Sequence, residues 1–214
     1  MGAGIPAWLP VAALAPAIAA LWFATRRLPL YKLEGDGEAL RVLLLGTLWL
    51  CGMRWFNTGA MQGVMLHFLG ASIATLMFGP RFACGVMALV SLSGWAMHAA
   101  WLGWAPDFLA TGVLPIAATV AVSRAARRWV PPNIFTYILV NAFLGGALAM
   151  AASTLFKAGV AWTWGGEGAG AYLAATPLLM YGEAFFTGTT LALVVVYRPQ
   201  WCASFDDATY LRGP

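Results

Sequence analysis

Seven apolar segments follow one another along the chain, each bounded by charged residues, proline or glycine. The segments cover residues 5–25, 40–56, 63–79, 82–104, 108–123, 133–156 and 170–197. Each has about the length that an α-helix needs to cross the hydrocarbon core of a bilayer, although several are near the minimum. The pattern predicts an all-α membrane helix bundle with about seven transmembrane helices, followed by a cytoplasmic tail at 198–214.

The composition agrees with a membrane protein and excludes several functions. Hydrophobic residues make up 61% of the chain and charged residues 9%, which leaves too little polar surface for a soluble globule. No polar linker or repeat of fixed period divides the sequence, so 1–214 is expected to be a single integral-membrane domain. Motifs for ATP binding, metalloprotease or serine-hydrolase chemistry are absent, and we expect no enzymatic activity.

The lysine and arginine residues predict the orientation. Ten of the 12 fall in alternate connections or in the tail, and these are Arg26, Arg27, Lys32, Arg41, Arg81, Arg124, Arg127, Arg128, Arg198 and Arg212. Arg54 and Lys157 fall in the opposite set. Because cationic residues resist translocation, we expect the amino terminus outside and the carboxyl terminus inside a bacterial inner membrane. The net charge of +4 is explained by this rule, so no nucleic-acid partner is expected.

Both histidines lie near the outer ends of predicted helices, His67 in the third segment and His98 in the fourth. Imidazole is a borderline ligand for cobalt, nickel, copper and zinc, and two imidazoles on neighbouring antiparallel helices could face one site. The alternative is that each ring only hydrogen-bonds a carbonyl group of a neighbouring helix.

Sulfur donors occur in the same outer third of the predicted bundle. They include Cys51 and Met53 at the end of the second segment, Met65 in the third, and Met97 beside the second histidine. Thioether and thiolate ligands combined with imidazole would suit Cu(I). Methionine is also common filler in apolar bundles, so packing is the alternative role for most of these residues.

Glu183 is the one acidic residue near the middle of a predicted span, a placement that costs roughly 2.5–3.5 kcal/mol on insertion scales. We expect it to be protonated and hydrogen-bonded to Asn141, Thr187 or a backbone carbonyl as a structural clamp. The alternative is a part in a proton or cation path.

Three stretches of the chain carry a family resemblance. They are His67–Ala71 with Leu76–Pro80, then Val140–Phe143, and finally Glu183–Phe185 with Tyr197–Pro199. Together they resemble the CbiM/NikM-type cobalt/nickel-uptake membrane proteins, which are substrate-capture components of energy-coupling-factor transporters. The resemblance spans most of residues 63–198 and implies the same seven-span topology with the amino terminus outside.

The resemblance also implies a ligand set and partners. In that family the terminal amine, a backbone nitrogen and a histidine at position two join a histidine from a transmembrane helix around the metal. His67 matches the helix histidine, whereas Gly2 stands where the second histidine would be. The family further implies an ABC-type ATPase pair and a coupling membrane subunit, because a chain without an ATP-binding motif needs partners for energised transport.

Three functional hypotheses follow. The first is capture and uptake of a transition-metal ion (Co, Ni or Cu) as substrate, with His67 as a ligand and His98, Met65 or the amino terminus completing the site. The second is an accessory subunit of a larger membrane complex that keeps the scaffold but has lost the metal site. The third is a haem-bearing subunit with two histidine ligands. We adopt the first, with membrane lipids as surroundings and no cofactor besides the transported ion.

Overall fold

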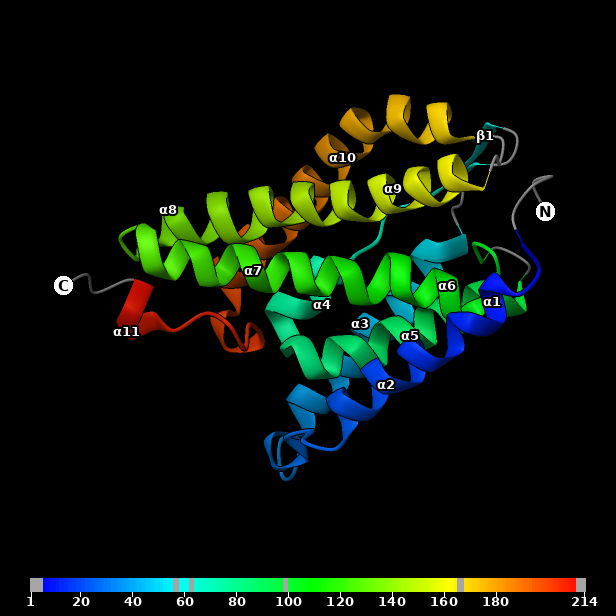
Figure 1. The fold of residues 1–214 in the computed structure, drawn as a ribbon. Coiled ribbons are helices and arrows are strands. Elements are labelled where there is room, and N and C mark those ends of the chain that lie inside the picture. The colour runs from blue at the N-terminus through cyan, green and yellow to red at the C-terminus, as the bar shows by residue number, and fades with distance from the viewer. Residues whose placement is uncertain (1–5, 56–57, 62–63, 98–99, 165–167, 211–214) are drawn as a thin grey trace.

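The computed structural model describes residues 6–55, 58–61, 64–97, 100–164 and 168–210, and of Lys32, Trp55, 58–61 and 64–66 only the backbone. Two of its long helices, α7 (Leu114–Trp129) and α9 (Gly145–Thr163), run side by side (Figure 1). Apart from one short antiparallel hairpin, the regular elements of the described chain are helical. The predicted all-α membrane helix bundle is confirmed.

The amino-terminal half combines short and medium-length helices. These are α1 (Leu9–Ala12), α2 (Leu14–Thr25), α3 (Gly37–Trp55), α4 (Ala71–Phe78) and α5 (Pro80–Ala96), with a 3₁₀ turn at Leu30–Lys32 and the strands β1 (Thr58–Met61) and β2 (Val64–Leu66). Helix α5 packs against α2, α3 and α4, while α4 also contacts α7, α9 and α10 of the other half. Helix α4 is therefore the centre of the bundle.

The carboxyl-terminal half contains three long helical stretches and a short tail. Its elements are α6 (Trp104–Phe108), the π-helical η2 (Leu109–Val113), α7 (Leu114–Trp129), α8 (Ile134–Thr136), the π-helical η3 (Tyr137–Leu144), α9 (Gly145–Thr163), α10 (Ala169–Tyr197), the 3₁₀ turn η4 (Pro199–Trp201) and α11 (Asp207–Tyr210). Among the described residues, Trp104–Trp129, Ile134–Thr163 and Ala169–Tyr197 are long and apolar enough to cross a membrane. Leu9–Thr25 is a shorter apolar helix.

The third predicted segment is the main correction to the expected spans. We expected one helix over 63–79, but residues 67–70 lack helical structure and α4 covers only Ala71–Phe78, about 12 Å of helix. Gly70 and Gly79 bracket α4 with φ angles of +64° and +83°, which side-chain-bearing residues rarely adopt. Pro80 then begins α5, because its missing N–H is tolerated in the first turn.

Two other helices are longer than expected. The fifth runs over Trp104–Trp129 instead of 108–123, and the sixth ends at Thr163 instead of 156. Asp107 and Lys157, which we placed outside the apolar spans, consequently lie inside helices. A prediction from hydropathy ends a span at a charged residue. In the folded protein, a charged residue with an oppositely charged partner can lie inside the helix.

The uneven distribution of cations has a counterpart in the fold. Arg27 follows α2 and Arg81 lies at the start of α5, and the Arg81 guanidinium donates a hydrogen bond to the Arg27 carbonyl oxygen at 2.8 Å. Both side chains are exposed. Arg54 and Lys157, the two cations outside the set of ten, are instead only 2% exposed. Both exceptions to the charge rule are thus buried, and the orientation in the membrane stays a prediction.

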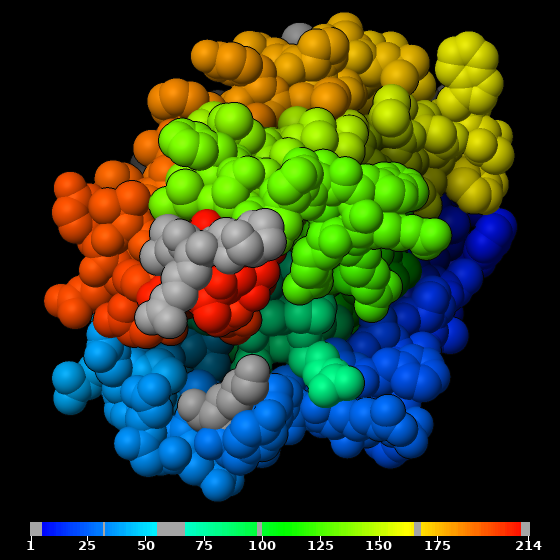
Figure 2. Space-filling model, turned by 90° about the vertical axis from the view of Figure 1, so that its left-hand side faces the viewer, coloured from blue at the N-terminus to red at the C-terminus, as the bar shows by residue number. Residues whose placement is uncertain are grey.

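The tail folds back onto the bundle. The backbone N–H groups of Ala203 and Ser204 donate to the carbonyl oxygens of Met77 and Leu76, at 2.8 and 3.2 Å. Viewed from the end that holds the carboxyl terminus, the tail (red) lies between green segments of the second half and blue segments of the first (Figure 2). The tail therefore satisfies carbonyl groups at the end of α4 that have no partner within the helix.

An aromatic cluster fastens the tail. The ring of Phe205 lies 4.9 Å from that of Tyr137 in η3 and 5.3 Å from that of Tyr210 in α11, measured between centroids.

Phe205→Ala should lower the free energy of unfolding by about 3 kcal/mol, because a buried ring is removed. Thermal unfolding in detergent measures the loss. Phe135→Ala, at a ring that is 72% exposed, is the control and should change little.

Candidate functional site

A buried ion pair joins two helices near one end of the bundle. Arg54 is the penultimate residue of α3, and its Nη2 lies 2.6 Å from Oδ1 of Asp107 in α6, with both side chains almost completely buried. The same carboxylate oxygen accepts the backbone N–H of Trp101 at 3.0 Å. Thr111 contacts the other carboxylate oxygen at 3.4 Å. Asp107 is thereby held in place from its own helix and from the segment before it.

His67 lies against the same guanidinium. It belongs to the segment 67–70 before α4, which corrects the expectation that it sits on a transmembrane helix. Arg54 Nη1 donates to Nε2 of the imidazole, so the ring hydrogen is assigned to Nδ1. In the described part of the chain, Nδ1 is buried without a hydrogen-bond partner. His67 is therefore a neutral imidazole with its acceptor nitrogen turned to a cation.

Lys157 adds a second buried cation. Its Nζ lies 5.8 Å from the centroid of the Trp101 ring, within the range of a cation–π interaction. It also interacts electrostatically with Asp107, favourably, and with Arg54, unfavourably. Two cations, Arg54 and Lys157, consequently share the carboxylate of Asp107. The net charge of these three side chains near His67 is therefore positive.

Glu183 binds the backbone just before α4. Its two carboxyl oxygens accept the N–H groups of Leu69 and Gly70, each at 2.9 Å, and the side chain is fully buried in α10. We expected Asn141, Thr187 or a carbonyl group as the partner, and this is corrected. The N–H groups at the start of a helix have no intrahelical acceptor, so a carboxyl group is the stronger partner for them.

Asn141 and Thr187 are both buried, but neither hydrogen-bonds the carboxyl group of Glu183 in the described part of the chain. Asn141 Oδ1 and Thr187 Oγ1 have no hydrogen-bond partner among the described residues. A Cβ added at Gly146 would lie 3.1 Å from the Glu183 carbonyl oxygen and 3.0 Å from the Thr187 side chain. Gly146 therefore permits the close approach of α9 and α10 beside Glu183 and Thr187.

The structure describes only some of the other predicted ligands. His98 lies outside the described residues, and of Met65 only the backbone in β2 is described. Cys51 and Met53 are half-buried in the last turns of α3, while Met97 follows α5 and is 45% exposed. Within the described ranges, no group of three or more His, Cys, Asp or Glu side chains could hold a metal ion. The haem hypothesis requires His98 and stays untested.

Arg54, Asp107 and Lys157 were not predicted as site residues. One signal for them was available. Arg54 and Lys157 are the two cations that disagree with the charge asymmetry of the other ten, and Asp107 is the acidic residue that borders an apolar segment. Cations and an anion that border apolar segments on the same predicted side can satisfy one another as a buried group.

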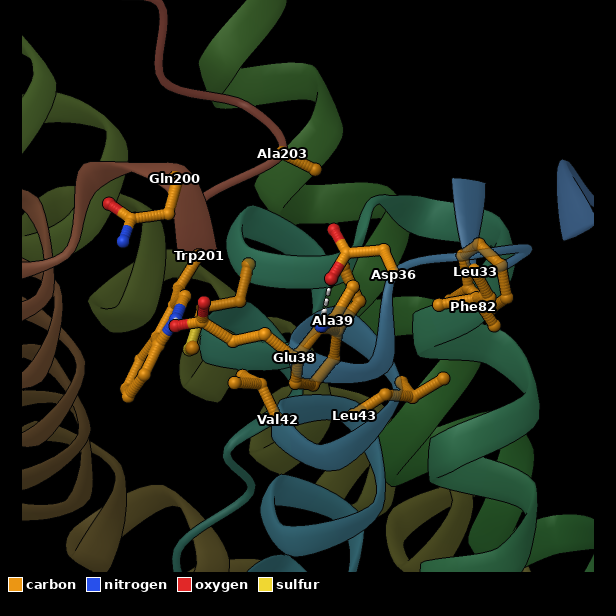
Figure 3. Close-up of a pocket in the computed structure, with 12 residues that line it drawn as sticks. Leu33, Asp36, Glu38, Ala39, Val42, Leu43, Phe82, Gln200, Trp201 and Ala203 are labelled. Atoms are coloured by element: carbon orange, nitrogen blue, oxygen red, sulfur yellow. Dashed lines mark hydrogen bonds between the residues drawn. The ribbon is translucent and has the colours of Figure 1, made fainter. Parts of the chain in front are cut away.

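A pocket of about 260 Å³ lies at the opposite end of α3 (Figure 3). Its wall is mostly apolar, and its two acidic residues already have partners. Asp36 accepts the backbone N–H of Ala39 at 2.9 Å, and Glu38 accepts the indole N–H of Trp201 at 2.7 Å. Its lining residues include no histidine or cysteine. The pocket joins the start of α3 to the tail and lacks the ligands of a transition-metal site.

Comparisons with known proteins agree on one family and one fold. The sequence model of the family described as "Cobalt uptake substrate-specific transmembrane region" matches residues 3–201. A solved structure described as a transition metal transporter superposes with a TM-score of 0.68 at 13% identity, covering 94% of this chain and 92% of that one. A truncated transition metal transporter gives a TM-score of 0.70 at 13% identity, covering 94% and 98%. A comparison with curated proteins found no match. At such identities the structural similarity shows the fold alone.

Glu183→Ala should destabilise the protein by about 2–4 kcal/mol, because two buried N–H groups before α4 lose their acceptor. Glu183→Gln retains one acceptor oxygen and should lose about half as much. Unfolding in detergent, followed by the helical circular-dichroism signal, measures both. Glu34→Gln, at an exposed carboxylate, is the matched control. Equal stability of the Ala and Gln variants would contradict the bidentate role of the carboxyl group.

Asp107→Asn should cost about 3 kcal/mol of folding stability, since it leaves the buried Arg54 charge without its anion. The double variant Arg54→Met/Asp107→Leu removes both charges and should recover most of the loss. Thermal unfolding of the single and double variants measures this difference. A double variant as unstable as Asp107→Asn would show that the ion pair is not what the single substitution disrupts.

Proposed function

This chain belongs to the family described as the cobalt uptake substrate-specific transmembrane region, and we propose that it captures a transition-metal ion for uptake across the membrane. Cobalt and nickel are the first candidates for the ion and copper the next. Members of this family are components of uptake systems and not enzymes. We place the protein in the bacterial inner membrane with its amino terminus outside.

The observation that carries the proposal is the family match over residues 3–201, nearly the whole chain. The buried imidazole of His67 also supports the proposal, because it is a suitable metal ligand. His67 lies near the end of α3 that we predict to face outside, and its neutral form is the one that binds Co²⁺, Ni²⁺ or Cu²⁺. Enclosure by helices removes bulk water, so a captured ion would exchange part of its hydration shell for protein ligands.

The remaining ligands are proposed from the sequence. His98, Met65 and the amino terminus are on the predicted outer side, together with Cys51, Met53 and Met97. Glu183 has a positioning role in this proposal. By binding the N–H groups of Leu69 and Gly70, it holds the segment that carries the imidazole.

Energised uptake would require partners. The chain contains no phosphate-binding loop, so we propose an ABC-type ATPase pair and a coupling membrane subunit as its partners. The exposed arginines after α2 and in the last turn of α7 belong to the end that we predict to face the cytoplasm, where an ATPase would act.

A second candidate is an accessory subunit that keeps the scaffold and no longer binds metal. One observation favours it: Arg54 contacts an imidazole nitrogen of His67 that a metal ion would need. Under this alternative the protein co-purifies in mild detergent with another membrane complex and carries no metal.

The direct test is metal analysis of the purified full-length protein. We expect Co²⁺ or Ni²⁺ to be retained at about one ion per chain. His67→Ala should reduce binding at least tenfold, because the imidazole is the central ligand of the proposed site. Leu178→Ala is the control, since that side chain is 75% exposed in α10, is not a proposed ligand and should change binding little.

Two results would contradict the proposal. One is metal-free protein after purification in the presence of each ion. The other is unchanged growth of a deletion strain when cobalt and nickel are limiting. Co-purification with another membrane complex would then support the accessory role.

A further inference from the structure

Arg54 holds two potential metal ligands at once. Its two terminal nitrogens, bonded to one carbon atom, contact Nε2 of His67 and Oδ1 of Asp107, the latter at 2.6 Å. An imidazole nitrogen and a carboxylate oxygen are both common ligands of first-row transition metals. Side chains from three separate parts of the chain therefore converge on a single planar cation.

The space for this cation is built into the neighbouring helix. A Cβ atom added at Gly94 of α5 would lie 2.6 Å from Nε of Arg54 and 3.2 Å from its Nη2. The guanidinium can consequently lie between His67, Asp107 and α5 only because residue 94 has no side chain. All three polar residues are more than nine-tenths buried, so the arrangement is a closed internal site.

Electrostatics makes Arg54 and a metal ion mutually exclusive at this place. Arg54 and Lys157 already contribute two positive charges near Asp107, and the imidazole is neutral. A divalent ion added to His67 would be repelled by both cations while sharing one carboxylate with them. Departure of the guanidinium removes a repelling charge and frees a nitrogen and an oxygen ligand in the same step.

The position of Arg54 in the fold permits such a departure. The residue is the last but one of α3, at the end of the helix that we predict to face outside. A long arginine side chain near a helix end can direct its charged group to the water interface while its methylene groups remain in the apolar region. An arginine at the middle of the span would have no such alternative.

We propose that Asp107 is a ligand of the transported ion and that Arg54 occupies the site as an internal cation until the ion displaces it. This rests on the proposed function and deepens it. In the metal-free protein, His67 and Asp107 are held together around the guanidinium of Arg54. The incoming metal ion takes the place of the guanidinium, and water completes its coordination shell. Selectivity then includes the ability of the ion to compete with a resident positive charge.

The test compares Co²⁺ and Ni²⁺ affinities of full-length variants in detergent by isothermal titration calorimetry. Arg54→Gln should bind at least tenfold more tightly than the wild type, because the competing charge is gone. The double variant Arg54→Gln/Asp107→Asn should lose that gain. Arg127→Gln makes the same change of net charge at an exposed residue in the last turn of α7, and its affinity should equal that of the wild type.

Each departure from this pattern has a distinct meaning. A folded Arg54→Gln variant that binds no more tightly than the wild type overturns the role of Arg54. A double variant as tight as Arg54→Gln overturns Asp107 as a ligand. In both cases His67-dependent binding by the wild type would leave the proposed function standing, whereas absence of Co²⁺, Ni²⁺ and Cu²⁺ binding in every form would refute it.

Arg54→Lys carries the test if Arg54→Gln does not elute as a folded monodisperse protein. A lysine keeps the charge beside Asp107, but its single nitrogen lacks the planar fork that reaches the imidazole as well. We expect its affinity for Co²⁺ or Ni²⁺ to rise about threefold. A folded Arg54→Lys variant with wild-type affinity would overturn the proposal.

Discussion

Backbone groups inside a bilayer need internal partners, and helix α4 is a short, largely buried helix that takes such partners from distant parts of the chain. A helix of eight residues leaves most of its terminal N–H and C=O groups without intrahelical partners. Glu183 of α10, 114 residues from Leu69, binds the N–H groups before its first turn. Ser204 of the tail, 128 residues from Leu76, binds a carbonyl of its last turn. Both ends of α4 are thus held by the last third of the chain, and α5, α7 and α9 pack around it.

The position of α4 also determines the chemistry of the candidate site. Because the carboxyl group of Glu183 holds the segment that precedes α4, His67 lies against α3 and near α6 instead of on a spanning helix. There it joins an ion pair whose two charges would each be costly alone. The imidazole is accordingly part of an ionic network with Arg54, Asp107 and Lys157, and any ion that it binds has to enter that network.

The network also places a carboxylate beside the imidazole. Asp107 and His67 both contact the guanidinium of Arg54, and both are almost completely buried. A carboxylate oxygen and an imidazole nitrogen are ligands that first-row transition metals accept. The arginine between them would have to leave before an ion could bind both groups.

The sequence by itself determined the membrane-helix class, the approximate place of most helices and the need of Glu183 for an internal partner. These depend on local hydropathy and on the cost of single charges in an apolar segment, and both can be read along the chain. The sequence did not determine that the helix of the third segment covers only Ala71–Phe78 and that residues 67–70 are not helical, because that depends on Glu183 and the tail. Nor did it reveal the partners of Arg54, Asp107 and Lys157. Their burial is favourable only after residues far apart in sequence meet, and that meeting is decided by tertiary packing.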